Sequence, residues 1–313
     1  MITILITIIS SLLGIAFFTI AERKLLASIQ RRRGPNMTGF WGILQAFADG
    51  LKLLLKELII PTRANWILFL FFPLFTLVVA LVIWVFIPFS DLNYLTNFDY
   101  SLLWIYAISS LGVYGIIGAG WSSNSKYAFL GGLRSAAQLI SYEISVALLL
   151  LPVAACSNSF NLIEIVAKQK ISVWYCVPLL PTTVVFFISV LAETNRSPFD
   201  LPEAEAEIVA GYNVEYSSMT FAMFFLAEYS NMLWLSVLTS ICFFGGWLSP
   251  TSYFEDGYIW LIIKTLVVSF LIIKVRANYP RYRYDQLMHL GWKIFLPFTL
   301  GYFIFVVGIL SLI

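Results

Sequence analysis

Long apolar runs are the feature that most restricts the fold of this chain. Eight runs approach the roughly 20 apolar residues that a helix needs to cross a bilayer. They lie at about 2–21, 66–88, 102–120, 135–156, 173–192, 218–243, 258–276 and 292–312. Because backbone polar groups in lipid need partners within the protein, continuous runs of this length predict helices rather than the alternating strands of a barrel. The sequence therefore predicts an all-α integral membrane protein with a single transmembrane domain over 1–313.

The composition excludes a water-soluble globule. With 60% hydrophobic and 12% charged residues, the 313-residue chain has too little polar surface to cover itself in water. The first run leads directly into Glu22-Arg23-Lys24 without a small-residue cleavage site, which predicts a retained helix and not a signal or transit peptide. A span at the very start is expected of a bacterial or organelle-encoded protein.

Basic residues are distributed unevenly between the connections. The connections after the first, third, fifth and seventh runs contain Arg23, Lys24, Arg31, Arg32, Arg33, Lys52, Lys56, Arg63, Lys126, Arg134, Arg196, Lys274, Arg276, Arg281, Arg283 and Lys293. The connections after the second, fourth and sixth runs contain only Lys168 and Lys170. By the positive-inside rule, the basic connections face the cytoplasm or matrix and both termini face the opposite side.

The connection 193–216, which we call the acidic connection, concentrates negative charge on this basic side. Its sequence ETNRSPFDLPEAEAEIVAGYNVEY contains one cation, Arg196, and six acids: Glu193, Asp200, Glu203, Glu205, Glu207 and Glu215. Pro198 and Pro202 interrupt a continuous helix, and the flanking residues predict a short one over about 201–210. Acids at a helix start can merely complement its dipole. Acids two residues apart point to different sides, however, so we favour a functional acidic site over a solvated loop.

The segment 40–60 is predicted to be an amphipathic helix at the membrane interface. Its polar stripe consists of Gln45, Asp49, Lys52 and Lys56, and leucines and phenylalanines form the opposite face. The helix is either a surface anchor or the wall of a cavity. An inward-facing Asp49 beside Lys52 favours the cavity wall.

Three ionisable residues lie within apolar runs, namely Glu143, Glu228 and Lys264. Each carries a cost of a few kcal/mol unless it is paired or hydrated. A structural role is open for each: an ion pair of Glu228 with Lys264, or solvation of Glu143 by Ser141 and Tyr142.

A functional role is also open, because these acids extend a series of carboxylates. Glu22 and Glu193 lie at the ends of two runs and lead toward the acidic connection. Partly desolvated carboxylates can exchange protons near neutral pH, so the series has the chemistry of a proton path.

No motif for a metal or nucleotide is present. Cys156, Cys176 and Cys242 are far apart, and His289 is the single histidine, so no zinc, disulfide or iron–sulfur arrangement can be argued. The glycines of one run predict close helix packing rather than nucleotide binding. These are Gly112, Gly115, Gly118 and Gly120.

Five longer stretches are more specific. They are AERKLLASIQRRRGPN (21–36), LQAFADGLKLLLKE (44–57), GWSSNSKYAFLGGLRSAAQLISYE (120–143), LAETNRSPFDLPEAEAEIVAGYNVEYSSM (191–219) and RANYPRYRYDQLMHLGWK (276–293). Together they resemble the subunit 1 family of respiratory complex I, the NADH:ubiquinone oxidoreductase, over essentially the whole chain. The form is typical of a mitochondrial genome.

The resemblance implies a place in a multi-subunit complex of the mitochondrial inner membrane. The subunit would sit where the membrane arm meets the peripheral arm and would enclose a ubiquinone tunnel with neighbouring subunits. Ubiquinone would be the substrate, while NADH, FMN and iron–sulfur clusters would bind in partner subunits. Its contacts would be the quinone-site subunits of the peripheral arm, adjacent membrane-arm subunits and lipid, with no nucleic acid.

The resemblance also implies roles for individual residues. Proton coupling would involve Asp49, Glu143, Glu193, Glu203, Glu205, Glu207 and Glu228. The quinone tunnel would be lined by Arg23, Arg33, Asp49, Lys52 and Phe225. The junction between the arms would involve Arg134, Arg196, Arg276, Arg281, Arg283 and Asp285. No metal ligand is implied.

The chain departs from the family pattern after the amphipathic helix. Lys56-Glu57-Leu58 delays the proline to Pro61, which predicts a helix longer by one turn. Three other functions are open. They are a proton or sodium transporter, the homologous subunit of a hydrogenase-type or chloroplast-type complex, and a structural anchor. The duplicated halves typical of many transporters are not evident.

Overall fold

The computed structural model describes residues 2–90, 98–200, 211–250 and 254–312. Its helices are α1 Ile2–Ile29, α2 Gln45–Leu55, α3 Trp66–Val82, α4 Ser101–Ser122, α5 Lys126–Ser157, α6 Leu162–Ile171, α7 Leu180–Glu193, α9 Ser218–Phe243, α10 Tyr258–Asn278, α11 Tyr284–His289 and α12 Leu296–Leu310. A π-helical turn, Leu290–Phe295, joins α11 to α12. Within the described ranges there is no strand, so the predicted all-α class is confirmed.

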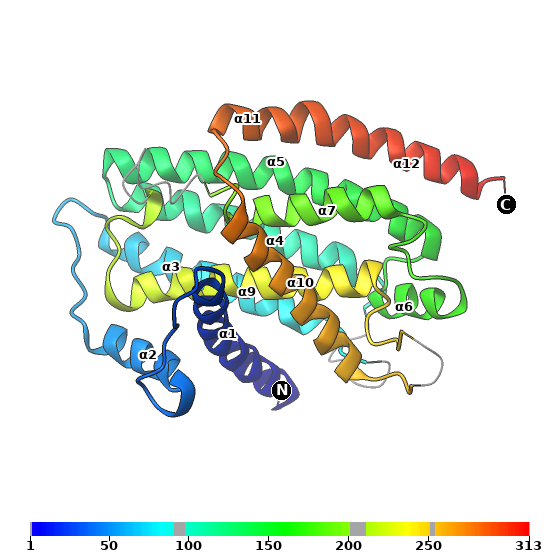
Figure 1. Cartoon of the computed structure of the whole chain (residues 1–313). Coiled ribbons are helices and arrows are strands. Elements are labelled where there is room, and N and C mark those ends of the chain that lie inside the picture. The colour runs from blue at the N-terminus through cyan, green and yellow to red at the C-terminus, as the bar shows by residue number, and fades with distance from the viewer. Residues whose placement is uncertain (1, 91–97, 201–210, 251–253, 313) are drawn as a thin grey trace.

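The helices form one bundle. Figure 1 shows α3, α4, α5, α7 and α9 side by side, with α1 and α10 crossing at an angle and α12 along α5. Seven helical stretches in the described part of the chain, counting α11 to α12 as one, are long and apolar enough to cross a membrane. The shorter α7 is also apolar. The chain is therefore a multi-pass membrane protein.

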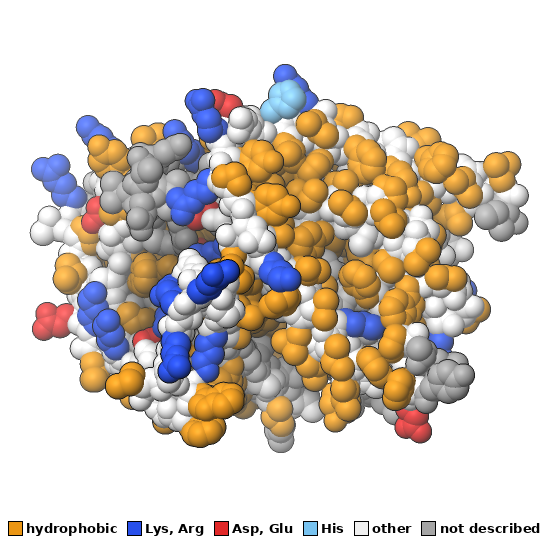
Figure 2. All heavy atoms as spheres, in the orientation of Figure 1, with side chains coloured by type: hydrophobic (Ala, Val, Ile, Leu, Met, Phe, Trp, Pro, Cys, Tyr) orange, Lys and Arg blue, Asp and Glu red, His pale blue; other side chains and the backbone are white. Residues whose placement is uncertain are grey.

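Several helices continue beyond the apolar runs that predict them. α1 runs past 21 to Ile29, α5 begins at Lys126 rather than 135, and the last helical stretch begins at Tyr284 rather than 292. A hydropathy window ends at the first charges, whereas a helix continues wherever its charged side chains find partners or reach the interface. The basic ends of the helices gather at one end of the bundle, at the left of Figure 2.

The predicted extension of the amphipathic helix is wrong. α2 ends at Leu55, and Lys56 is extended. The hydroxyl of Ser218, at the start of α9, donates to the carbonyls of Leu53 at 3.0 Å and Lys56 at 2.7 Å. These bonds satisfy carbonyls at the C-terminal end of α2 and hold that end against the start of α9.

The glycines of α4 allow close helix packing, as predicted. A Cβ atom on Gly115 would lie 2.1 Å from Thr76 Cγ2, and one on Gly118 would lie 2.1 Å from Phe72 Cζ, both on α3. A Cβ on Gly120 would lie 2.8 Å from a carbonyl oxygen of α5. Gly112 differs, because no atom lies within 4 Å of its added Cβ.

Lys264 on α10 is not the partner of Glu228, so that predicted ion pair is wrong. Its ammonium donates to three backbone carbonyls beyond the end of α9, and it lies 4.2 Å from the centre of the Trp174 ring. The carbonyls belong to Phe244 at 2.6 Å, Gly246 at 3.0 Å and Leu248 at 2.7 Å. Lys264 thus holds the loop between α9 and α10 instead of compensating the charge of Glu228.

Candidate functional site

Three acids from different helices line one internal cavity. Glu143 of α5, Glu193 at the end of α7 and Glu228 of α9 surround about 70 Å³ of space for water-sized molecules. A water needs roughly 10–15 Å³ of such space, so the cavity has room for several. The acids are far apart along the chain, and helix packing brings them together. The open space beside Gly112 also belongs to this cavity.

The three acids differ in their hydrogen bonds. The hydroxyl of Tyr212 donates to Glu228 Oε1 at 2.8 Å. The hydroxyl of Ser109 donates to Glu143 Oε1 at a long 3.5 Å. Glu193 Oε2 and Asn195 Oδ1 are buried without a partner among the described residues. Buried oxygens of this kind require donors, and the cavity has room for waters that would supply them.

The alternative in which Ser141 and Tyr142 solvate Glu143 is wrong. Ser141 Oγ donates to carbonyls of its own helix, Ala137 O at 2.7 Å and Gln138 O at 2.9 Å. Tyr142 donates to Leu287 O at 3.0 Å and so ties α5 to α11. Ser141 and Tyr142 therefore do not bond the Glu143 carboxyl group, and Glu143 lines the cavity.

Helix α5 holds both described ends of the acidic connection. Gln138 Nε2 donates to Ala192 O and to Phe199 O, each at 2.8 Å, so the chain turns sharply after Glu193. At the far end, Gly211 packs on Gly131, where an added Cβ would lie 2.6 Å from the Gly211 Cα. Only a glycine allows this approach. Because of these two contacts, Asn195 and Tyr212 both reach the cavity.

A buried ion cluster lies beside the cavity, centred on Glu22 of α1. The carboxylate is 2% exposed and contacts Arg276, Arg196 Nη1 at 3.6 Å and the hydroxyl of Tyr229 at 2.5 Å. Arg196 is itself 5% exposed and lies 4.5 Å from the centre of the Tyr229 ring. Burial alone would lower the pKa of Arg196, but Tyr229, Glu22 and Glu228 raise it, so the guanidinium stays charged.

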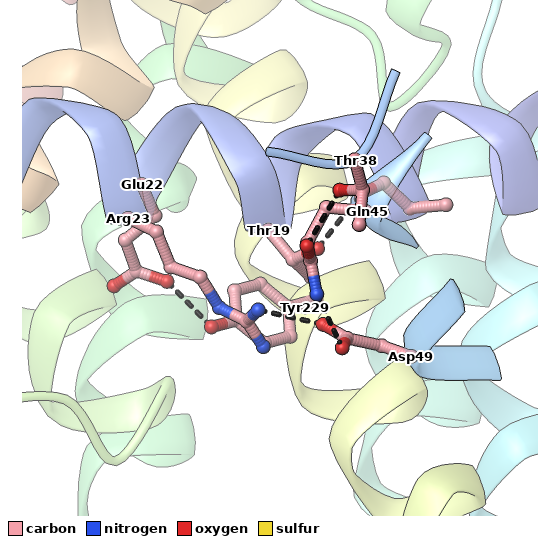
Figure 3. A network of polar contacts seen from close by, with 8 residues as sticks. Thr19, Glu22, Arg23, Thr38, Gln45, Asp49 and Tyr229 are labelled. Atoms are coloured by element: carbon pink, nitrogen blue, oxygen red, sulfur yellow. Dashed lines mark hydrogen bonds and ion pairs between the residues drawn. The ribbon is translucent and has the colours of Figure 1, made fainter. Parts of the chain in front are cut away.

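A second polar chain joins α1 to α2 (Figure 3). Thr38 donates to Gln45 at 2.6 Å, Gln45 donates to Asp49 at 2.8 Å, and Arg23 of α1 donates to Asp49 at 2.6 Å. The Gln45 and Asp49 part of the polar stripe of α2 therefore faces α1. α2 itself has no buried residue, and its Lys52 is exposed.

The profile of the NADH dehydrogenase family matches residues 2–307. The chain belongs to this family. A relative from Chondrus crispus named "NADH-ubiquinone oxidoreductase chain 1" is 54% identical over 314 residues, covering 99% of this chain and 96% of the relative. A relative of the same name from Arabidopsis thaliana is 57% identical over 303 residues, covering 96% and 93%. Another of that name, from Triticum aestivum, is 57% identical over 310 residues, covering 98% and 95%.

Arg33 and Phe225, two other residues singled out in this NADH dehydrogenase family member, lie outside the cavity. Arg33 lines an open groove near the end of α1. Phe225 is half-buried and packs on Phe221 with ring centres 4.5 Å apart, while its neighbour Phe224 lines the cavity. Glu203, Glu205 and Glu207, with the predicted helix 201–210, lie outside the described residues.

The residues predicted for a junction between arms fall into two groups. Arg196 and Arg276 point inward to Glu22. The remaining four are Arg134, Arg281, Arg283 and Asp285. Arg134 lies over the Tyr284 ring at 5.7 Å. Arg281 pairs with buried Asp200 at 3.3 Å, and the exposed Arg283 and Asp285 are 3.9 Å apart.

Sequence reasoning missed the neutral polar residues of this family member's site. They are Ser109, Gln138, Asn195, Tyr212 and Tyr229. Serine, glutamine and tyrosine carry no net charge, so they do not stand out in an apolar run as a carboxylate does. Tyr212 was visible only as part of the acidic connection, and no spacing in the sequence relates it to Glu228.

Proposed function

We propose that this chain is a core membrane subunit of a proton-pumping NADH:ubiquinone oxidoreductase and couples quinone reduction to proton translocation. The names of its relatives support the complex, and the shared cavity of Glu143, Glu193 and Glu228 supports the coupling role. The cavity is the observation that carries the proposal. In this proposal, three carboxylates that share one cavity gain and lose protons as a group.

The acidic connection is the part of the chain that would sense the quinone. Glu193 belongs both to this connection and to the cavity, and Tyr212 links its other end to Glu228. Reduction of ubiquinone takes up two electrons and two protons, and this changes the charge balance nearby. A shift of protons among Glu203, Glu205 and Glu207 would reach the cavity acids through Glu193 and Tyr212.

The helices α1 and α2 are the proposed wall of the quinone tunnel. Ubiquinone has an apolar tail, so its path must be apolar with polar groups only where the headgroup passes. The Arg23–Asp49 pair, Arg33 and Lys52 would supply those groups. Phe225 would contribute apolar wall, and neighbouring subunits would close the tunnel. NADH, FMN and the iron–sulfur clusters would supply electrons from partner subunits.

The inner end of the bundle is the proposed junction with the peripheral arm. Arg134, Arg281, Arg283 and Asp285 lie there and would contact its quinone-site subunits. Arg196 and Arg276 would act from inside, by fixing the end of α1. The membrane is proposed to be the mitochondrial inner membrane, with both termini toward the intermembrane space.

The coupling role is tested by Glu143→Gln in the assembled complex, with quinone reduction and proton translocation measured together. We expect both rates to fall roughly 100-fold, the lower end of what a positioned proton-transfer group contributes. The exposed Glu164→Gln on α6 serves as the control and should leave both rates unchanged. Wild-type values for Glu143→Gln in both assays would defeat the coupling role.

Copurification tests the assignment to this complex. Flavin- and iron–sulfur-containing NADH oxidase subunits should accompany the chain from its native membrane. A hydrogenase-type or chloroplast-type complex would bring other electron-donor subunits, and a standalone transporter would bring none.

A further inference from the structure

Two serines at the start of α9 bond to a distant part of the chain. Ser217 is the residue before α9, where a serine usually accepts a hydrogen bond from its own helix. Its hydroxyl oxygen instead accepts from the N–H of Ile59 at 3.2 Å. The Ser218 hydroxyl shares its hydrogen between the carbonyls of Leu53 at 3.0 Å and Lys56 at 2.7 Å. We call these bonds the serine clamp, because they hold the end of α2 and the residues that follow it.

The backbone of Ser218 lies in a conformation that favours glycine. Its φ is 59°, in the left-handed region, where a Cβ atom is unfavourable and glycine is not. The residue is 4% exposed, so its hydroxyl must find acceptors within the protein. Residues held in such conformations gather at sites with a function. Because the backbone would favour glycine, the hydroxyl is what explains a serine at this position.

The position of α2 depends on few contacts other than the serine clamp. α2 has no buried residue, so core packing does not fix it. Its middle contacts α1 through the partly exposed Arg23–Asp49 pair and through Phe17 and Phe47, whose ring centres are 6.2 Å apart. Exposed ion pairs contribute little to stability. Loss of the clamp would therefore release the C-terminal end of α2 from α9.

The serine clamp directly follows the acidic connection. Tyr212, near the end of this connection, donates to Glu228 in the cavity. Tyr216, its last residue, stacks on Phe69 of α3 with ring centres 4.1 Å apart, which fixes the chain just before the clamp. One short segment, 212–218, thus contacts the cavity at one end and α2 at the other.

We propose that Ser218 is a positioning residue for ubiquinone, because it holds α2 in the position that binds the quinone. This inference rests on the proposed function, in which α1 and α2 form the wall of the quinone tunnel. Without the Ser218 hydroxyl, α2 occupies that position for a smaller fraction of the time, and the apparent affinity for quinone falls with that fraction. Ser218 acts through α2 and not on the quinone itself, so the reduction of bound quinone should keep its rate.

The test compares Ser218→Ala with Ser218→Gly in the assembled complex, with NADH-driven reduction of a short-chain ubiquinone measured over a range of quinone concentrations. Both variants lack the hydroxyl, but only glycine relieves the left-handed backbone. We expect each to raise KM about fivefold, the factor that one hydrogen bond contributes, with kcat unchanged. The glycine variant should have the higher melting temperature. Ser240→Ala is the control and should keep the wild-type KM, because that hydroxyl bonds the Ser236 carbonyl of its own helix at 2.8 Å.

A wild-type KM in both Ser218 variants would overturn the proposal. A KM near wild type in the glycine variant alone would also overturn it, because the effect would then follow stability and not the hydroxyl. If neither variant assembles, hydrogen exchange of the Ile59 N–H in the wild-type complex decides. Since binding and position are linked, saturating short-chain ubiquinone should slow this exchange. Unchanged exchange would overturn the proposal.

Glu143→Gln in the same assays separates this inference from the proposed function. If the Ser218 variants behave as wild type while Glu143→Gln loses quinone reduction and proton translocation, only the positioning role of Ser218 fails. If Glu143→Gln also behaves as wild type, the coupling role fails as well.

Discussion

The hydroxyl of Tyr212 donates to Glu228 Oε1 at 2.8 Å. This bond joins the end of the acidic connection to the middle of α9, and both residues line the cavity that contains Glu143 and Glu193. A movement of the connection would therefore change the hydrogen bonding of a membrane-embedded acid directly. Arg196 and Glu22 form a second link, because the same connection holds the C-terminal part of α1 through them.

Removal of the Tyr212 hydroxyl should reduce the coupling of proton translocation to quinone reduction, with only a small loss of stability. Tyr212→Phe keeps the ring against Phe224, whose centre is 5.4 Å away, but removes the bond to Glu228. We expect a loss of about 1 kcal/mol in stability and fewer protons translocated per quinone reduced. Tyr216→Phe is the control, because that hydroxyl bonds Ser122 at 3.1 Å and no carboxylate. Equal effects of the two variants on proton translocation would contradict the linking role of Tyr212.

Neutralising Glu22 should destabilise the chain strongly. Glu22→Gln leaves Arg196 buried without its carboxylate, and breaking a buried ion pair in this way costs about 3–5 kcal/mol. Thermal unfolding of the assembly measures the loss. For comparison, Asp49→Asn breaks a pair with 52% and 36% exposed side chains, and it should change stability by about 1 kcal/mol or less. Similar melting points for the two variants would mean that the Glu22 cluster contributes little.

An added methyl group should destabilise the chain at one glycine of α4 but not at another. Gly115→Ala places a Cβ 2.1 Å from Thr76, so α3 and α4 must separate, at a cost of about 1–3 kcal/mol. Gly112→Ala points into the cavity, where no atom lies within 4 Å, and should not destabilise the chain. Assembly yield and melting temperature of the two variants check this expectation. A stable Gly115→Ala would show that the α3–α4 packing is looser than described.

Asp256 lies between α9 and α10, and its contribution to the stability of the fold should be lost in acid. Partial burial would raise its pKa, but the Lys170 ammonium at 2.7 Å and the Ser249 N–H at 2.8 Å hold the pKa of Asp256 below its usual 3.8. A lowered pKa in the folded state stabilises the fold above the unfolded pKa, and this is lost as pH falls through the folded value. Asp256→Asn should therefore lower stability by about 1 kcal/mol or less at neutral pH.

Melting temperatures of wild type and Asp256→Asn over a pH series measure that difference. The difference between the two melting temperatures should be constant above pH 3.8 and should disappear below it. A difference that increases in acid would contradict the prediction, because a carboxylate stabilised in its charged form loses its effect when it is protonated. Lys170→Ala should reproduce the neutral-pH loss, because it removes the other side of the same pair.

The fold class and the acids of the cavity could be predicted from sequence because both depend on desolvation. A long apolar run forms a helix in lipid, because its backbone groups must bond one another. A carboxylate within such a run can be recognised without knowledge of its neighbours in space. Glu143 and Glu228 were found in this way, and Glu193 was found at the end of a run as the first acid of the acidic connection. Helix ends were less predictable, since the end of α2 is capped by Ser218, which is far away in the sequence.

Tertiary structure alone decided which of these groups meet. The sequence allowed an ion pair between Lys264 and Glu228, but Lys264 binds carbonyls beyond α9. The hydroxyl of Tyr212 donates to Glu228 instead. The physical reason is distance. The energy of burying a charge depends on the residue and the membrane and can be read along the chain. A hydrogen bond depends on about 3 Å between two atoms, and only the packing of the helices sets that separation.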